Sequence, residues 1–229
     1  DPTTGIATMG HLLVFNPSTR AVDLTITAFF ENEEPKSFSM RAEAGCTSES
    51  NYRNWPISPG QRFALKVESP IPVVVQATLG WNNTANLYAP TAPTQDPQQR
   101  EAATSYLSVP APATRWYVAD GIVLDKPSDL WIRESEWAVL LNPGDASAYV
   151  QLGLFYRLLM REHDVDVPPR RVKTVRLDDL VLLPNKHYGV RITSDQPIVV
   201  QWRRQVYWNN SPSLMSFWSM PALALAEAK

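Results

Sequence analysis

The chain has 229 residues, 44% hydrophobic residues and a net charge of −2. This length suits two domains of ordinary size, and the near-neutral charge gives no general attraction to nucleic acid or anionic lipid. A single cysteine, Cys46, excludes an internal disulfide and favours a reducing compartment such as the cytoplasm. No apolar run reaches the roughly 18 residues of a membrane span. No signal peptide opens the chain, although a start at Asp1 is also compatible with earlier cleavage.

The sequence repeats itself in order. Four segments return in the second half: 13–17 as 139–143, 72–76 as 197–201, 81–83 as 208–210, and 105–111 as 216–222. Matched segments in a constant order predict a tandem duplication. The proline-rich link at 109–113 places the boundary, so we expect a first domain over 1–112 and a second over 113–229.

Strands are predicted along the whole chain. Apolar and polar residues alternate over 22–28 and 148–154, which is typical of half-buried strands. Further strands are expected near 36–41, 61–67, 72–79, 104–109, 162–167, 186–193, 197–206 and 214–220. Turn residues separate them, and twenty prolines disfavour helices. The predicted fold is all-β: two tandem β-sandwich domains of the same topology, with at most one helical turn in the tail 221–229.

The two copies differ in two places. The first carries a proline- and glutamine-rich insert near 85–100, which predicts a solvated loop. The second has a fuller entry segment at 115–121, where the first has only 4–7. The first copy is therefore the more divergent one.

The second copy resembles the soluble transducer family of microbial sensory rhodopsins. Trp116 with 119–121 carries this resemblance, together with the segments 141–145, 167–171, 175–180 and 194–201 and the following Arg204. The first copy has Leu79 near the position of Arg204. The resemblance implies a small, cytoplasmic, non-enzymatic β-sandwich that oligomerises, with single-domain members tetrameric. It also implies binding of a photoreceptor, of DNA or of small molecules, among which sugars are favoured.

Trp202 and Arg204 form the first candidate ligand site. Alternation places both on one face of the strand over 197–206. A guanidinium beside an indole suits a polyol or planar ligand. In the alternative interpretation Trp202 is a core residue and Arg204 extends from the edge of the sheet to solvent.

The repeated Trp-Asn-Asn triplet is a second candidate. In the second copy it comprises Trp208, Asn209 and Asn210, and amides beside an indole are a plausible sugar-contact set. The alternative is a turn whose asparagines cap the backbone.

A third candidate is a cluster of tryptophans near acidic residues, which could wall a pocket with acidic hydrogen-bond acceptors or belong to a core with a polar rim. Its members are Trp116, Trp131 and Trp137, with Asp120, Glu134 and Glu136. A basic stretch, Arg170, Arg171, Lys173 and Arg176, could contact phosphate, although alternating charges on a strand usually face solvent.

No catalytic residue, metal site or cofactor is predicted. The three histidines have no ligand spacing, and Glu162 and His163 point to opposite faces of a strand. No nucleophile elbow, phosphate loop or H-E-x-x-H motif occurs.

The predicted function is a non-enzymatic sensory protein that binds a small sugar-like molecule and relays its presence to a partner. The alternative is a transducer that contacts protein or DNA without a small ligand, and the net charge makes nucleic acid the less favoured partner. Because single-domain relatives resemble tetramers, two-copy chains are expected to form a homodimer.

Overall fold

The computed structural model describes residues 7–58, 61–82, 101–123, 132–180, 183, 185–208 and 214–224. Within these ranges the chain is antiparallel β-structure with two single-turn 3-10 helices, which confirms the predicted all-β class. No helix in the described ranges is long and apolar enough to cross a membrane.

In the first half the described elements are β1 (Ala7–Phe15), β2 (Val22–Phe30), β3 (Lys36–Ala42), β4 (Thr47–Asn51), η1 (Tyr52–Asn54), β5 (Phe63–Glu68), β6 (Val74–Asn82) and β7 (Glu101–Leu107). They form two sheets with strand orders β4-β1-β6-β7 and β3-β2-β5. The pairing is antiparallel throughout, as in a β-sandwich.

In the second half they are β8 (Ala113–Gly121), β9 (Ile132–Asn142), β10 (Ala148–Phe155), β11 (Met160–Val167), β12 (Arg171–Arg176), η2 (Leu177–Asp179), β13 (Tyr188–Trp208), β14 (Leu214–Pro221) and β15 (Leu223–Ala224). The first part of β13 pairs with β10 and β8, and its second part pairs with β9 and β14. This long strand therefore belongs to both layers of the sandwich.

Two sequence predictions are corrected here. Separate strands over 186–193 and 197–206 are one strand, β13. Pro197 is tolerated because pairing with β10 ends at Ser194 and pairing with β9 begins at Val199, so the missing N–H falls between the layers. In the tail, Leu223 and Ala224 pair with β8 as a short strand and form no helical turn, and 225–229 lie outside the described residues.

The two halves share one pairing pattern. Each described pairing in the first half has an equivalent in the second: β1 with β4 and β6 matches β9 with β12 and β13, and β2 with β3 and β5 matches β10 with β11 and β13. The register agrees too, because Leu13 faces Gln76 as Val139 faces Gln201. This agreement supports the predicted duplication and the boundary at 112/113, both of which remain proposals.

A buried asparagine holds the same corner in each half. Asn16 is fully buried and donates its side-chain N–H groups to the carbonyls of Arg20 (2.8 Å) and Ala42 (3.1 Å). Asn142, equally buried, donates to Ala146 (2.8 Å) and Val167 (3.0 Å). Each therefore satisfies backbone carbonyls that the turn leaves unpaired.

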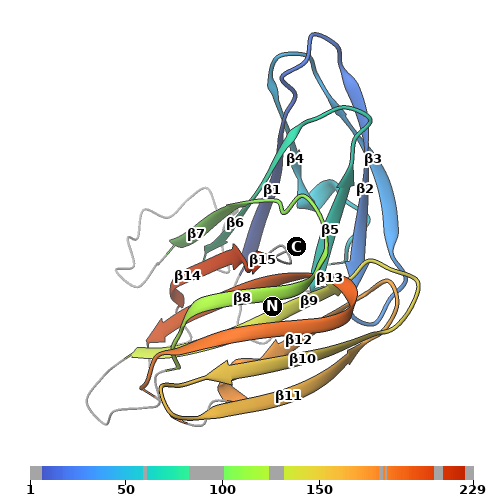
Figure 1. Cartoon of the computed structure of the whole chain (residues 1–229). Helices are drawn as coiled ribbons and strands as arrows, with labels where there is room; N and C mark the ends of the chain where they lie inside the picture. The colour runs from blue at the N-terminus through green and yellow to red at the C-terminus, as the bar shows by residue number, and fades with distance from the viewer. Residues whose placement is uncertain are drawn as a thin grey trace, which may run out of the picture.

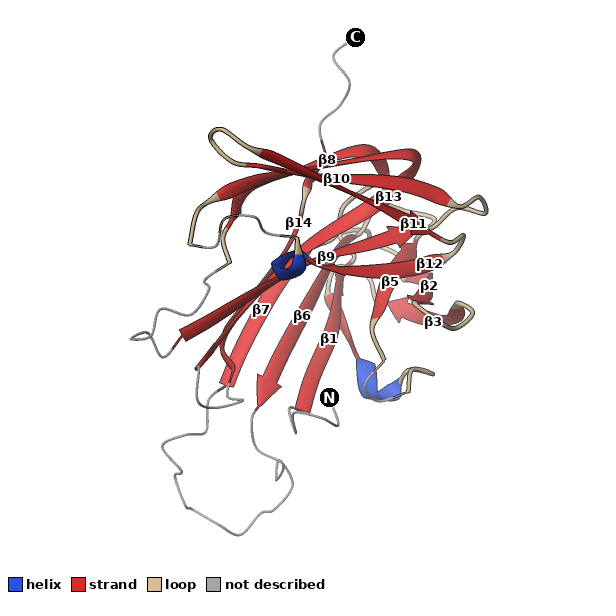
Figure 2. Cartoon of the chain, turned by 90° about the horizontal axis from the view of Figure 1, so that it is seen from below, coloured by secondary structure: helices blue, strands red, loops and turns tan. Residues whose placement is uncertain are grey.

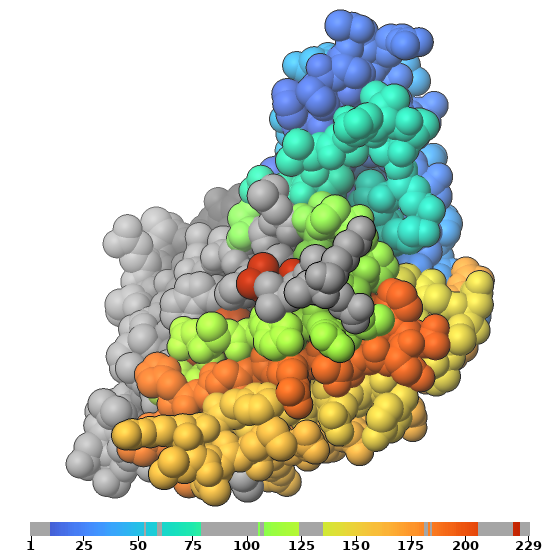
Figure 3. Space-filling model, in the orientation of Figure 1, coloured from blue at the N-terminus to red at the C-terminus, as the bar shows by residue number. Residues whose placement is uncertain are grey.

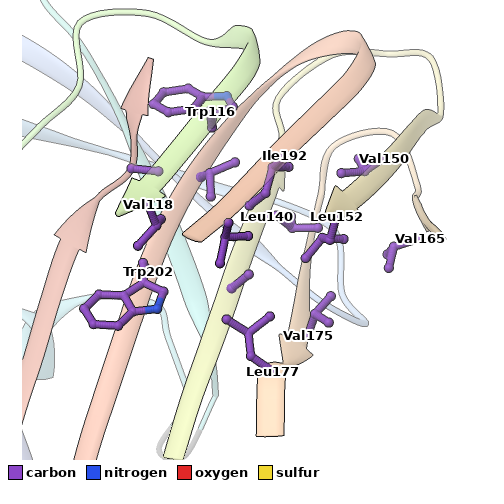
Figure 4. Close-up of a cluster of buried hydrophobic side chains, with 14 of the residues drawn as sticks. Trp116, Val118, Leu140, Val150, Leu152, Val165, Val175, Leu177, Ile192 and Trp202 are labelled. Atoms are coloured by element: carbon purple, nitrogen blue, oxygen red, sulfur yellow. The ribbon is translucent and has the colours of Figure 1, made fainter. Parts of the chain in front are cut away.

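Each half encloses its own hydrophobic core between its layers. Figure 4 shows that of the second half, with Trp116, Leu140, Leu152, Ile192 and Trp202 pointing into the space between the strands. The core of the first half is built from aliphatic residues of β1 and β2, with Trp55 at one end.

The strands of the first half cross the direction of the strands of the second half (Figure 1). One end of the first half extends away from the second half (Figure 3). A third apolar cluster joins them: Phe29 and Ala64 of the first half pack on the outer face of β9, β12 and β13, made by Val139, Leu141, Val172 and Val199. At its edge Glu34 pairs with Arg171, and Glu31 lies 3.5 Å from Lys173. Figure 2 shows β7, β6 and β1 side by side in their sheet. β7 also contacts β14 of the second half.

Candidate functional site

Glu136 lies at one end of the second core. Along β9, alternation directs Ala138, Leu140 and Glu136 inward, so a carboxylate enters a position that otherwise takes an apolar side chain. The residue is fully buried. A buried carboxylate needs compensating partners, and its surroundings define the candidate site.

Arg204 is the main partner of Glu136. The two residues face each other across β9 and β13, and the Arg204 Nε lies 2.8 Å from the Glu136 Oε1. Only 12% of the Arg204 side chain is exposed. Its guanidinium also donates to the Asp120 carbonyl (2.7 Å) and lies 4.7 Å from the centroid of the Trp202 ring. Arg204 is thus held on three sides by its own chain.

Two further donors complete the pairing of Glu136. The Tyr188 hydroxyl donates to Oε2, and the Ile122 N–H donates to Oε1 at 3.1 Å. The backbone N–H of Glu136 donates to the Asp178 carboxylate at 2.7 Å. We call Glu136, Arg204, Tyr188 and Asp120 the polar cluster.

Burial dominates the electrostatics of the polar cluster. It raises the pKa of Glu136, while the bonds from Tyr188, Ile122 and Arg204 oppose that shift. Burial, with the nearby Glu136 charge, also raises the pKa of Tyr188, so its hydroxyl stays protonated and remains a donor. The polar cluster therefore holds a carboxyl group with a raised pKa in the core, bonded to donors of its own chain.

One glycine makes room for the tyrosine. A Cβ at Gly121 would lie 2.4 Å from the ring of Tyr188, closer than any side chain tolerates. The close approach of β8 to the Tyr188 ring therefore requires glycine at position 121. Gly121 is the last residue of the entry segment 115–121 that the sequence analysis singled out.

The predicted site residues are partly brought together. Asp120, Glu136, Trp202 and Arg204 converge at the polar cluster, with Asp120 70% exposed at its mouth beside His187 (3.3 Å).

Trp116 lies elsewhere in the core. It is fully buried, and its indole N–H donates to the carbonyls of Ala113 (3.0 Å) and Ile198 (3.1 Å), so it is not open to a solute. Trp208 ends β13 opposite Ile132. Asn209 and Asn210 lie outside the described residues.

Trp202 itself is a core residue, only 4% exposed. Its indole N–H finds no acceptor among the described residues. Arg204 does not extend to solvent as in the alternative interpretation, because its guanidinium is bonded to a buried carboxylate.

The basic stretch makes ion pairs within the chain. Arg171 and Lys173 meet Glu34 and Glu31 of the first half, and the Arg176 guanidinium lies 3.0 Å from the Asp178 carboxylate. These pairs account for the positions of Arg171, Lys173 and Arg176. No group of three or more potential metal ligands occurs among the described residues.

The first half lacks the polar cluster. By register, Gly10 takes the place of Glu136, Leu79 that of Arg204, and Phe63 that of Tyr188. The Tyr52 ring fills the space, because a Cβ at Gly10 would lie 2.0 Å from it. Aromatic side chains therefore occupy this position in the first half, and the ring centroids of Tyr52 and Trp55 are 4.4 Å apart. The two halves thus carry a polar and an aromatic version of one position.

These features coincide with a family match. Residues 111–221 match the family model described as Anabaena sensory rhodopsin transducer. The second half of this chain is therefore similar to that transducer family. A comparison with curated proteins finds no match.

Two solved structures are similar to this chain over part of its length. One is a Thermotoga maritima protein, Thermotoga maritima 1070, which is 24% identical over 49% of this chain and 94% of its own, with a TM-score of 0.42. Another is the Anabaena sensory rhodopsin transducer, 27% identical over 40% of this chain and 86% of its own, with a TM-score of 0.34.

Within the second half, sequence reasoning missed Tyr188 and Asp178. The alternation that placed Trp202 and Arg204 on one face could have placed Tyr188 near them only if β13 had been expected as one strand. Asp178 acts from η2, a turn that no periodic pattern indicates. Contacts of this kind depend on tertiary structure.

Proposed function

We propose that the protein is a non-enzymatic signal transducer that acts through protein contacts, as a cytoplasmic homodimer. The observation that carries this proposal is the internal satisfaction of Glu136: both of its carboxylate oxygens accept bonds from the chain itself. A carboxylate used in this way supports the fold and has little left for a substrate. The family of the second half agrees with a transducer role.

The outer face of β10 and β11 is our candidate contact surface. Glu162, Asp164 and Asp166 alternate along β11 and are exposed, and β11 ends the strand order of its sheet. Tyr149 of β10 is 48% exposed beside them, and its pKa is raised by a hydrogen bond to Asp164, by desolvation and by the negative charges of this face. We call these four residues the acidic face.

An acidic face favours a basic protein segment and disfavours DNA, because phosphates would be repelled. An edge strand also offers backbone groups to an extended partner. We therefore propose a lysine- or arginine-rich segment of a signalling protein as the contact.

A titration of ¹⁵N-labelled protein with a short lysine-rich peptide tests this proposal. We expect chemical-shift changes confined to β10 and β11 and their loss in the triple variant Glu162→Gln, Asp164→Asn, Asp166→Asn. The matched control neutralises Asp23, Glu43 and Glu68 of the first half and should leave binding intact. Peptide binding that ignores the acidic face, or duplex DNA that competes for it, contradicts the proposal.

Sugar binding is the second candidate function. The convergence of four predicted residues and the unpaired indole N–H of Trp202 favour it, with Asp120 and His187 forming an exposed rim. Tryptophan fluorescence against a sugar library tests this candidate. The exposed side chain of Asp120 contributes little to folding, so Asp120→Ala should remain folded. A saturable fluorescence response that is lost in this variant would favour sugar binding over the transducer proposal.

A further inference from the structure

One strand pairing of the second half has no equivalent in the described part of the first half. In the second half, the first part of β13 lies between β10 and β8. Its counterpart in the first half is β5, which pairs with β2 alone among the described strands and ends its sheet. Figure 1 shows β2 and β3 on the same side of β5. Within the described residues, β5 therefore has an open edge where the second half carries β8.

The side chains beside this edge are more exposed in the first half than in the second. In the second half, Val190, Ile192 and Ile198 are 3%, 1% and 0% exposed. By register and by the repeat, their equivalents in the first half are Leu65, Val67 and Val73. These three residues are only partly buried, and we call them the open strip. In Figure 3 the teal residues, which include β5, lie on the visible surface of the first half.

Strand β8 closes the equivalent strip in the second half. Trp116 lies opposite Ile192 in the register, and Val118 lies opposite Val190. Both side chains of β8 are buried in the core. The Trp116 indole also donates to the carbonyl of Ile198 at 3.1 Å. An aromatic and an aliphatic residue at alternate positions of a neighbouring strand are therefore what this part of the core accommodates.

The large aromatic residues of the first half serve another position. Tyr52 belongs to η1 and Trp55 follows it, as Leu180 follows η2 in the second half. Their rings contact Phe38 and Phe63 at one end of the core. The open strip stays partly exposed beside them, so these rings do not replace β8.

The outer face of β5 adds an electrostatic preference. Glu68 is exposed there, and the Lys66 ammonium lies 2.7 Å from its carboxylate. The equivalent of Glu68 in the second half is Thr193, which faces Arg115 of β8. A basic residue at the position of Arg115 in an added strand would lie beside the Glu68 carboxylate, a favourable cross-strand pair. Apolar fit and charge therefore favour the same order of side chains, with a basic residue directly before the aromatic one.

We propose that the first half binds an extended segment of a partner protein as an added strand antiparallel to β5. This segment carries an aromatic residue opposite Val67, an aliphatic residue opposite Leu65 and a basic residue opposite Glu68. Backbone hydrogen bonds to the open edge supply affinity, and the open strip supplies specificity through alternate side chains. The site lies in the first half, so it is a contact surface beyond the acidic face of β10 and β11.

A fluorescein-labelled peptide with the sequence of residues 113–121 is a suitable probe, because β8 carries this order of side chains. We expect saturable binding to the full chain by fluorescence anisotropy. Trp116→Ala in the peptide should weaken binding about tenfold or more, because it removes the aromatic anchor. This arm of the test does not depend on the folding of a protein variant.

Matched variants of the protein locate the binding site. Val67→Gln, in the open strip, should weaken peptide binding to a similar degree. Val74→Gln, at a 50% exposed position of β6, is the control and should bind the peptide as the wild type does. Circular dichroism checks that both variants are folded. Equal peptide affinity of Val67→Gln and the wild type overturns the proposal.

Hydrogen exchange of the full chain with bound peptide tests the mode of binding. Strand addition should slow the exchange of alternate amides over 63–68, namely those that β2 leaves unpaired. Absence of saturable binding, binding without protection of β5, or protection confined to β13 overturns the proposal. Each of these results leaves the acidic-face titration unaffected, because that titration concerns β10 and β11, so the two proposals can fail separately.

Discussion

The Arg204 guanidinium lies 2.8 Å from the carboxylate of Glu136, a residue with no exposed surface. Removal of one partner from a buried ion pair leaves the other charge without compensation. This pair therefore controls stability in the second half.

The first prediction concerns Arg204→Ala. We expect a loss of about 3 kcal/mol or more in the free energy of unfolding, because Glu136 would remain buried without its cation. Urea denaturation measures this change, with Lys186→Ala, an exposed basic residue, as the control. A urea unfolding midpoint within error of that of the wild type would contradict this prediction and show that Arg204 is not needed for stability.

The sequence could predict part of this arrangement. Alternation along the strands placed Trp202 with Arg204, and the repeat predicted the shared topology that Asn16 and Asn142 exhibit. Burial of Glu136 was not predictable, because a carboxylate enters a core only where donors surround it, here Ile122 just after β8 and two side chains of β13. The continuity of β13 through Pro197 was missed for a similar reason, since the change of layer depends on the partners of the strand.

The second prediction concerns pH. Burial raises the pKa of Glu136 on folding, so the folded state binds this proton more tightly than the unfolded state. Its contribution to stability is fully present below the unfolded value, about 4.3, and is lost as pH rises through the folded pKa. Glu136→Gln cannot titrate.

Urea midpoints of the wild type and Glu136→Gln between pH 4 and 8 measure this effect. We expect the wild type to lose stability relative to the variant as pH rises. Parallel curves for the two proteins would show that Glu136 has the same pKa in both states.

A third prediction concerns Tyr188→Phe, which copies Phe63 of the first half. Loss of one donor leaves a Glu136 oxygen less well satisfied, at a cost of about 1.5–3 kcal/mol. The pKa of Glu136 should rise further, so the pH dependence should move to higher pH. Tyr149→Phe, at an exposed position, serves as control. Equal free energies of unfolding and equal pH dependence for the two variants would show that Tyr188 does not stabilise Glu136.

The fourth prediction concerns the shared corner. Asn16→Ala and Asn142→Ala should each cost about 2–3 kcal/mol, because each leaves buried carbonyls without donors. Similar losses are expected, since both bonds that Asn16 donates have equivalents at Asn142, which also donates to the Pro168 carbonyl at 3.2 Å. Asn32→Ala, on an exposed loop, should change the unfolding midpoint little, and a large difference between Asn16→Ala and Asn142→Ala would contradict the structural equivalence of the halves.

The central claim is that the polar cluster supports the fold of a protein-contacting transducer. Its most direct test follows the backbone amides of Ile122 and Glu136 in ¹⁵N-labelled protein during titration with a panel of mono- and disaccharides. We predict no saturable shift at either amide, because both N–H groups are bonded within the chain to carboxylates of the site. A saturable shift at both amides, at sugar concentrations that leave the first half unchanged, would contradict this account and make the cluster a ligand site.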